Sequence, residues 1–330
     1  MKQYDHVFGV DVSKKTVDIT HVINQQFTHR QFSNDEAGME QLMDWLKELT
    51  PAFDKTLFCM EATGLYCFPL TRFLAAHSID IWIEHAALIK KSTALVRGKN
   101  DKVDSQRIAL YATKNIERLR LWKPMNTTLE KIRHLASLRD RLVETKKKLA
   151  TPIHEFEDIG NHSMAKLLTK TIKSSLTAID KDLKNIESKI IDIVNEDDNL
   201  KLLYKLITSV VGIGFVTAIN LLIHTNGFTM MKDARKLACY CGVAPFEYSS
   251  GSSVRGKTKV HYMANKKLKC NLHMASLTAV KLDADLKAYY ERKVAEGKNK
   301  MSVLNAVKNK LLARVVSVVN KQQEYVKKSA

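Results

Sequence analysis

The chain has 330 residues, with 53 lysines and arginines against 35 aspartates and glutamates, so its formal net charge is +18. This length predicts two or three domains. The composition, 45% apolar with only 5 prolines and 12 glycines, excludes collagen-like and low-complexity classes and favours long helices. Residues 231–330 alone hold 21 Lys and Arg against 7 Asp and Glu. This basic excess predicts a polyanionic partner. Nucleic acid is the first candidate, and an anionic membrane surface is the second.

Residues 1–124 are predicted to form an α/β domain. Apolar or alternating runs at 6–13, 16–23, 26–33, 57–62 and 79–85 predict strands, and residues 34–49, 64–77 and 101–114 predict helices. The resulting order β-β-β-α-β-α-β-α is that of a ribonuclease H-like (RuvC-like) fold. Other α/β folds come close to this order.

Residues 125–203 have a different, heptad-like pattern. Apolar residues recur in steps of four and three at Ile172, Leu176, Ile179, Leu183, Ile186, Ile190 and Ile193, and an earlier arm repeats the trend. This pattern predicts an antiparallel coiled-coil hairpin, with Pro152 and Gly160–Asn161 at its tip. Whether the arms pair only with each other or also across subunits stays open.

The remaining residues are predicted to be mostly helical, as a compact unit at 204–295 followed by a basic C-terminal helix at 296–330. Residues 206–223 lack charge but contain polar residues and glycines, so we interpret them as two buried helices rather than a membrane span. The N-terminus lacks a signal-peptide pattern, and the five cysteines form no CxxC pair. A cytoplasmic protein is therefore expected.

Four carboxylates occur where a nuclease-type fold would need them. Asp11 and Glu61 lie near the ends of the first and fourth predicted strands, and Asp101 and Asp104 open a helix with an i, i+3 spacing. Together they could bind Mg²⁺, which prefers carboxylate oxygens. Each residue also has a simpler explanation: Asp11 as a turn residue, and Asp101 and Asp104 as helix-dipole partners. Glu61 is harder to explain this way, because it directly follows an apolar strand.

Two segments of the C-terminal half are candidate nucleic-acid contacts. Gly212 and Gly214 resemble the turn of a helix-hairpin-helix, which binds the phosphate backbone, although a helix-helix turn in a core is an equal alternative. The loop 245–259 holds four serines around Gly251 and would otherwise be a flexible connector. A basic strip suited to phosphate oxygens follows it, formed by Arg255, Lys257, Lys259, Lys266 and Lys267.

Three stretches, GVDVSKKTVDIT, MEATGLY and RGKNDKVDSQRIALYA, resemble the DEDD motifs of the insertion-sequence 110 family of transposases, relatives of the Piv invertases. GVAPFEYSSGSSVRGKTKV is similar to the second, transposase domain of that family. The resemblance covers nearly the whole chain. It implies a Mg²⁺-binding tetrad of Asp11, Glu61, Asp101 and Asp104, and a serine nucleophile at Ser250, with Ser249 as the nearest rival. One departure is Asn100 before the third acid, where relatives often have threonine.

The resemblance predicts an insertion-sequence transposase that cuts and rejoins double-stranded donor and target DNA through a phosphoserine. It further implies a noncoding bridge RNA as guide and a nucleoid-associated location. Because Asp104 and Ser250 fall in different predicted domains, separated by the predicted coiled coil, a site composed from two subunits is expected, and with it a homodimer or homotetramer. The alternative is a metal-dependent RuvC-like nuclease, such as a junction resolvase, that uses the tetrad alone. A sugar-kinase or actin-like ATPase would need a second Gly-rich phosphate loop, which the sequence lacks. A purely structural RNA-binding protein would tolerate loss of Asp11 or Glu61.

Overall fold

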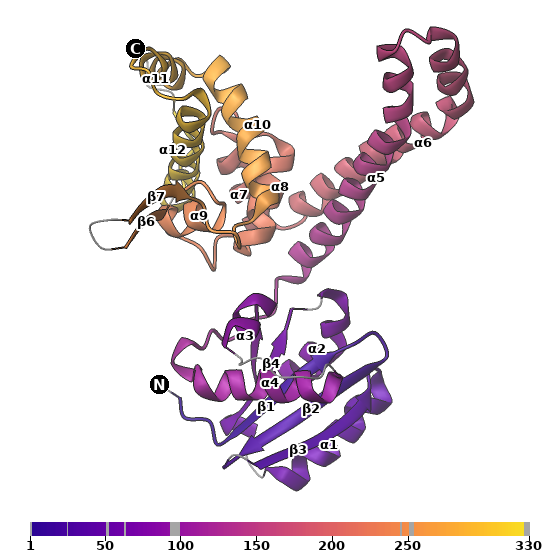
Figure 1. Cartoon of the computed structure of the whole chain (residues 1–330), viewed down its shortest axis with the longest axis vertical. Helices are drawn as coiled ribbons and strands as arrows, with labels where there is room; N and C mark the ends of the chain where they lie inside the picture. Colours follow the sequence, from indigo (N-terminus) through magenta and orange to yellow (C-terminus); the bar gives the residue numbers. More distant parts are fainter. Residues whose placement is uncertain are drawn as a thin grey trace. The chain divides into compact units, whose positions relative to one another are not determined.

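The computed structural model describes residues 2–24, 26–50, 53–62, 64–92, 100–244, 246–250 and 254–326, with the backbone alone at 246–250 and 254–259. The chain divides into two compact units, Met1–Pro124 and Met125–Ala330 (Figure 1). We call them the N-terminal unit and the C-terminal unit, and describe each by itself.

The N-terminal unit is built on one five-stranded sheet. Its main elements are β1 (His6–Val12), β2 (Thr16–Ile23), β3 (Gln26–Ser33), α1 (Glu36–Leu49), β4 (Thr56–Glu61), α2 (Phe68–Ala76), β5 (Asp80–Glu84), α3 (Ala86–Ser92) and α4 (Asp101–Lys114). The strand order is β3-β2-β1-β4-β5. The first three strands are antiparallel, whereas β4 and β5 run parallel to β1. The predicted α/β class of this region is confirmed.

Helices cover both faces of this sheet because its strands alternate apolar residues toward each side. On one face, Phe8 and Val10 of β1 are completely buried and belong to a core with residues of α1 and α2. On the other face, Val7 packs in a smaller core with residues of α3 and α4 (Figure 1). Asp11 has the same parity in β1 as Val7, so it lies on the α4 face.

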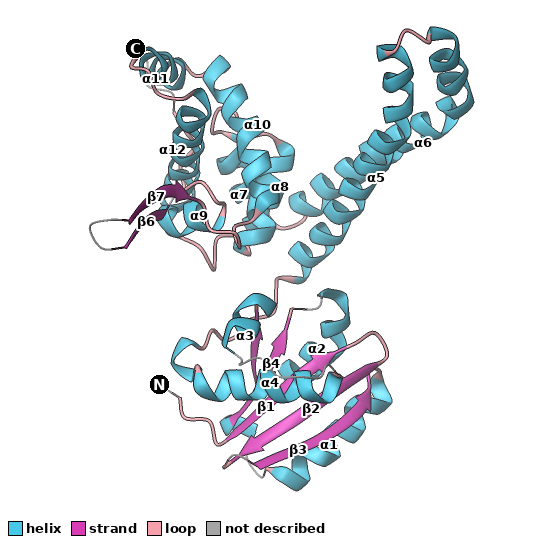
Figure 2. Ribbon diagram, in the orientation of Figure 1, coloured by secondary structure: helices cyan, strands magenta, loops and turns pink. Residues whose placement is uncertain are grey.

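The C-terminal unit is mostly helical, as predicted. It contains α5 (Thr127–Asp158), α6 (His162–Asn195), α7 (Asp198–Thr208), α8 (Phe215–Thr225), α9 (Ala234–Tyr240), β6 (Phe246–Ser250), β7 (Val254–Lys259), α10 (Lys266–Leu282), α11 (Ala284–Ala295) and α12 (Lys300–Lys321). Figure 2 shows β6 and β7 as a two-stranded ribbon among these helices. In the described part of the chain, no helix combines the length and apolarity that a membrane crossing requires.

Helices α5 and α6 form a long antiparallel hairpin. Arg139 Nε donates to Glu187 Oε1 at 2.6 Å, and Lys146 Nζ donates to Asp180 Oδ1 at 2.5 Å. From the first pair to the second, the partner moves seven residues forward along α5 and seven residues back along α6, so the two helices run antiparallel. The turn contains Gly160, which has a φ of +74°.

The expected place of Pro152 in the hairpin tip is wrong. Pro152 lies inside α5, which continues to Asp158. A proline in a helix interior removes one backbone hydrogen bond, at a cost that the surrounding turns of a 32-residue helix can offset. The chain reverses only at Gly160, because its positive φ is readily adopted by glycine.

The remaining helices surround a core to which α12 contributes a long apolar stripe. Residues Leu304, Val307, Leu311 and Val315 are all buried, as their spacing predicts. The uncharged stretch 206–223 forms the end of α7, a turn and most of α8, and Ala218 and Leu222 of α8 are completely buried. This apolar stretch therefore belongs to the interior of the C-terminal unit.

Candidate active site

Two carboxylates lie at the ends of the central parallel strands. Asp11 is the penultimate residue of β1, and Glu61 is the last residue of β4. Val10 pairs with Met60 in the parallel ladder, so one further step along each strand places Asp11 beside Glu61. Glu61 alternates with Cys59, which packs in the α4-side core, and therefore lies on the same face as Asp11.

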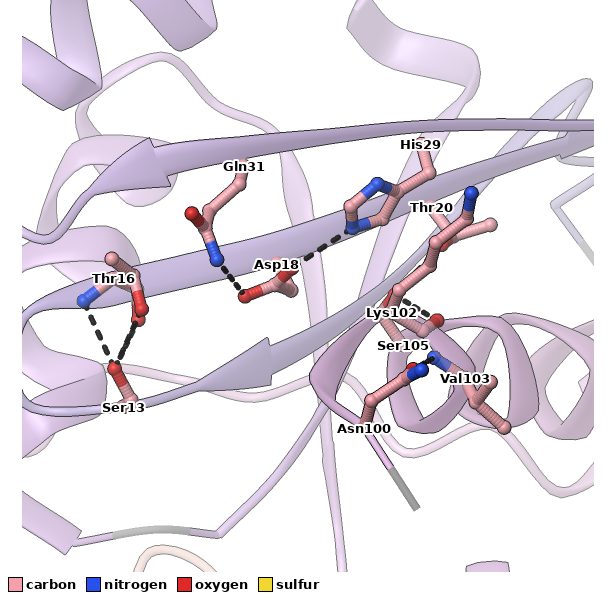
Figure 3. A network of polar contacts seen from close by, with 10 residues as sticks. All are labelled: Ser13, Thr16, Asp18, Thr20, His29, Gln31, Asn100, Lys102, Val103 and Ser105. Atoms are coloured by element: carbon pink, nitrogen blue, oxygen red, sulfur yellow. Dashed lines mark hydrogen bonds and ion pairs between the residues drawn. The ribbon is translucent and has the colours of Figure 1, made fainter. Parts of the chain in front are cut away.

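Helix α4 contributes the other two predicted acids in its first turn, Asp101 and Asp104. The helix begins there because the side chain of Asn100 caps it, accepting a hydrogen bond from the backbone N–H of Val103 at 2.8 Å. One turn further on, Ser105 Oγ lies 2.7 Å from Thr20 Oγ1 of β2 (Figure 3). This contact holds the acidic turn of α4 against the sheet.

Gly9 allows α4 to approach the sheet this closely. A Cβ at position 9 would lie 2.1 Å from the backbone nitrogen of Ala109 and 2.3 Å from the carbonyl oxygen of Ser105. Both atoms belong to helix backbone, so a side chain could be accommodated only by moving α4 away. The glycine two residues before Asp11 therefore sets the separation between α4 and the strand that carries this acid.

The four predicted carboxylates interact electrostatically. Burial, and then the negative charges of Asp101, Asp104, Asp18 and Glu61 in that order, together raise the pKa of Asp11 from 3.8 to about 6. Asp104 also accepts a hydrogen bond from Arg107 Nη1 at 2.7 Å, which partly compensates its charge. The structure thus brings the four residues into one electrostatic cluster, crowded enough to favour a proton on Asp11 at mildly acidic pH.

This cluster is not a closed metal site as it stands. Among the described residues, no three His, Cys, Asp or Glu side chains lie close enough together to hold a metal ion. The donor chemistry still fits Mg²⁺, which takes carboxylate oxygens and keeps several waters, so that few protein ligands suffice. The raised pKa of Asp11 is the observation that favours a cation here, because a positive charge would relieve the repulsion among the acids.

Two further acids, which our sequence analysis did not single out, extend the row across the sheet. Asp18 of β2 pairs with Asp11 in the antiparallel ladder and is only 3% exposed. It accepts a hydrogen bond from Gln31 Nε2 at 2.9 Å and lies 2.9 Å from His29 Nε2 (Figure 3). The strand also contains Thr16, Thr20 and His21, so its sequence does not mark Asp18 as a buried acid.

Glu84 of β5 completes the row beside Glu61, its partner in the parallel ladder. The hydroxyl of Tyr111 donates to Glu84 Oε2 at 2.9 Å, and the backbone N–H of His85 donates to Oε1 at 2.7 Å. Glu84 is thus held by two donors that belong to the protein. Only the register of the strands reveals its proximity to Glu61, and the sequence does not give that register.

The predicted serine loop is a β-hairpin for most of its length. Ser249 pairs with Arg255 and Ser250 with Val254, whereas residues 251–253 lie outside the described residues. The simpler alternative, a flexible connector, therefore does not describe residues 246–250 and 254–259. A ladder satisfies backbone groups of β6 and β7, and Ser250 belongs to its last described pair, with Val254.

Of the predicted basic strip, Arg255, Lys257 and Lys259 lie in β7, and Lys266 and Lys267 begin α10. Only the last two have described side chains. Lys266 is exposed, whereas Lys267 Nζ forms an ion pair with Asp140 Oδ2 of α5. Lys267 is therefore already engaged within the C-terminal unit.

The glycine turn between α7 and α8 has a clear packing role. Gly212 has a φ of +96°, and a Cβ there would lie 2.6 Å from the carbonyl oxygen of Ala275 in α10. Gly214 is the N-cap of α8 without a side-chain capping bond, and nothing lies within 4 Å of a Cβ at that position. The cavity beside this turn, about 490 Å³, is lined by Glu187 but by no lysine or arginine. The packing alternative therefore accounts for Gly212.

Comparison with known proteins identifies related chains along most of the sequence. A family described as "Transposase", of the DEDD type, matches residues 8–156, and the "Transposase IS116/IS110/IS902 family" matches residues 204–291. The "Pilin gene-inverting protein" of Moraxella lacunata is 23% identical over 328 residues, which covers 97% of each chain. Its counterpart in Moraxella bovis matches equally.

A further relative matches one part of the chain. The "Insertion element IS110 uncharacterized 43.6 kDa protein" of Streptomyces coelicolor is 29% identical over 138 residues, or 42% of this chain and 33% of that protein.

Proposed function

This chain is a DNA transposase of the IS110 family, and we propose that it cuts and rejoins DNA with a Mg²⁺-binding carboxylate tetrad and a serine nucleophile. The single observation that supports this most is the convergence of four acids around Asp11, whose pKa they raise. The sheet order, with three antiparallel strands followed by two parallel ones, supports a ribonuclease H-like fold for the N-terminal unit.

In this proposal Asp11, Glu61, Asp101 and Asp104 hold Mg²⁺. The bound cation would supply positive charge to the phosphate oxygens, which carry extra negative charge in the transition state. The protein's own contribution is the position of the acids: two come from adjacent strand ends, and two from the first turn of α4. Arg107 would help to hold Asp104 in place through its 2.7 Å hydrogen bond.

Ser250 is the proposed nucleophile. Its hydroxyl oxygen would attack the phosphorus of one DNA strand, form a serine-phosphate ester and release a DNA hydroxyl. A second DNA hydroxyl would then attack this ester and regenerate the serine, so the phosphodiester bond is conserved. The serine gives up a proton and the released DNA oxygen takes one up in the same step, so the exchange is balanced in protons as well as in phosphodiester bonds.

Nucleic acids are the proposed partners on several grounds. The family acts on DNA, and the net charge of +18 supports a polyanionic substrate. We assign backbone contacts to Arg255, Lys257, Lys259, Lys266 and Lys267, and to the turn at Gly212 and Gly214. We propose that the substrates are donor and target DNA and that a noncoding RNA guides the protein. We further propose that the protein is a homodimer or homotetramer and acts at the nucleoid.

A covalent-adduct assay tests the serine. The protein is incubated with labelled cognate donor DNA and Mg²⁺ and run on a denaturing gel, and the adduct is mapped by peptide analysis. Ser250→Ala should lose both adduct and recombination yet bind DNA, because the basic residues remain. Ser249→Ala is the matched control and should retain the adduct. Wild-type cleavage without any adduct would favour the alternative of a metal-dependent nuclease that uses the tetrad alone.

RNA guidance is tested separately. The protein is purified from cells that carry its gene with the flanking DNA, and the bound RNA is sequenced. A discrete RNA from the flanking noncoding stretch, with segments complementary to donor and target, is the expected result. Equal recombination by RNA-free protein would contradict guidance without affecting the serine assignment.

A further inference from the structure

The segment that carries Ser250 leaves and rejoins the helical core at two adjacent points. Helix α9 ends at Tyr240, and α10 begins at Lys266 with Asn265 as its N-cap. The backbone N–H of Asn265 donates to the carbonyl oxygen of Tyr240 at 2.8 Å. The serine hairpin, defined as residues 246–259, is therefore part of a loop whose two ends are hydrogen-bonded to each other.

Side chains of three elements meet at this junction. The Asn265 amide donates from Nδ2 to the Tyr240 hydroxyl oxygen at 3.2 Å, and that oxygen lies 3.1 Å from Nδ1 of His224, near the end of α8. Because the Tyr240 oxygen accepts from Asn265, its own proton is free to be donated to His224 Nδ1. Asn265 Oδ1 meanwhile caps α10 by accepting from the Leu268 N–H at 3.0 Å.

With the Tyr240 proton donated to Nδ1, His224 is neutral, and its surroundings favour that state. Asn265 Nδ2 also lies 3.3 Å from each ring nitrogen of His224. Burial lowers the pKa of His224, and the positive charges of Lys267 and Arg133 lower it further. An unprotonated Nδ1 is thus available as an acceptor at neutral pH.

The chain just beyond the junction is also fixed. Gly242 has a φ of +66°, and a Cβ at this position would lie 2.8 Å from Cβ of Ala264 and 3.0 Å from Cγ1 of Val260. The chain segments that enter and leave the loop therefore pack tightly against each other. Asn305 of α12 donates from Nδ2 to the carbonyl oxygen of Val243 at 2.7 Å. The base of the loop is therefore held to α8, α9, α10 and α12.

We propose that His224, Tyr240 and Asn265 form a clasp that fixes the base of the serine hairpin, and that they are positioning residues for Ser250. The proposal rests on the proposed serine chemistry. Nucleophilic attack requires the reacting atoms at about 3–3.5 Å, and a misplacement of about 1 Å can cost about a hundredfold in rate. The described ends of the segment that carries the hairpin are held to the helical core, so a movement of that base would be transmitted to Ser250.

Three substitutions test the clasp in the full-length protein. Tyr240→Phe removes one hydroxyl, and Asn265→Asp keeps the oxygen that caps α10 but replaces the donating amide by a carboxylate oxygen. Each should lower the rate of adduct formation at Ser250 by at least about tenfold, with DNA affinity and melting temperature close to wild type. His224→Leu should behave alike, whereas His224→Gln, which keeps an acceptor, should recover part of the rate.

Tyr204→Phe is the matched control, because Tyr204 is a partly buried tyrosine of α7 with no recorded hydroxyl hydrogen bond among the described residues. Amide hydrogen exchange gives a second readout without DNA: the clasp variants should exchange faster over 246–259 than wild type and the control.

Wild-type adduct rates and wild-type exchange in both Tyr240→Phe and Asn265→Asp would overturn the clasp. If wild-type protein itself forms no adduct, the serine chemistry fails, and unchanged exchange would then reject the clasp independently.

Discussion

At the residue scale, Asp11 links the fold to the proposed chemistry through its charge. Burial of its carboxylate, and then the charges of four other acids, raise its pKa to about 6. The folded protein therefore binds this proton more tightly than the unfolded chain, where the pKa is near 3.8. The contribution of Asp11 to stability is present below about pH 4 and is lost as the pH rises through about 6.

Asp11→Asn should consequently stabilise the metal-free protein at pH 7. We expect a gain of about 1–2 kcal/mol, because solvent screens part of the interaction in a partly exposed cluster. At pH 4 the gain should disappear, since wild-type Asp11 is then protonated. Urea melts in a chelator at both pH values measure this, with Asp44→Asn on the exposed face of α1 as control. A variant less stable than wild type at pH 7 would contradict the crowding.

Gly9→Ala should be strongly destabilising. The new methyl group would overlap the backbone of α4 at Ala109, and shifting a packed helix costs about 1–3 kcal/mol. Gly214→Ala is a suitable control because its Cβ meets nothing within 4 Å. The melting temperatures of both variants test this, and only that of Gly9→Ala should fall strongly. Equal stability of the two would show that α4 does not rest on β1 as described.

Individual residues show how far the sequence alone could lead. Asp11 and Glu61 were identifiable because each lies near the end of an apolar strand. Asp101 and Asp104 were identifiable because they open a predicted helix with an i, i+3 spacing. Asp18 and Glu84 escaped notice, because their proximity to these acids depends on strand register. Register is set by pairing between segments far apart in the chain, which no local pattern encodes.

At the element scale, the hairpin of α5 and α6 is held together by a shallow seam. Ile179 is only partly buried, and Leu138 of the other arm is 47% exposed. The two inter-arm ion pairs lie at the surface and add little to stability. We therefore propose that this pair is an antiparallel coiled coil whose exposed seam serves assembly or RNA binding rather than chemistry.

Ile179→Asp should weaken the pairing of the arms by about 1–3 kcal/mol, because it places a charge in the apolar seam. Ser175→Asp adds the same charge at an exposed position of α6 and should have little effect. The free energy of unfolding reports on the pairing of the two arms within one chain, and the mass by light scattering reports on assembly between chains. Unchanged values of both for Ile179→Asp would argue against a coiled coil.

The serine hairpin shows the limit of sequence reasoning for whole elements. Serines and glycines around residue 251 indicated a loop, yet alternation of β-forming residues such as Tyr248 and Val254 was also present. The segment forms paired strands rather than an irregular loop, because a two-stranded ladder satisfies backbone groups that a loop would leave to solvent. Composition alone did not predict the cross-strand pairing of 246–250 with 254–259, which came from the structure.

At the scale of the whole molecule, the proposed chemistry is divided between the two units. The four acids belong to residues 1–124, and Ser250 belongs to residues 125–330. Each unit has its own buried core, so a substitution in one set of catalytic residues should leave the other unit folded. The proposed oligomer would then allow acids from one subunit to act with a serine from another.

This division leads to a complementation experiment. Asp11→Asn and Ser250→Ala should each be inactive alone, whereas their mixture, after subunit exchange, should recover a measurable fraction of recombination. Recovery is expected because a mixed oligomer can contain an intact tetrad in one subunit and an intact serine in another. The double variant Asp11→Asn/Ser250→Ala mixed with either single variant is the control and should stay inactive, since each such mixture lacks one of the two groups entirely. Failure of the first mixture, with mixed oligomers demonstrated by differently tagged subunits, would mean that each subunit uses its own acids and its own serine.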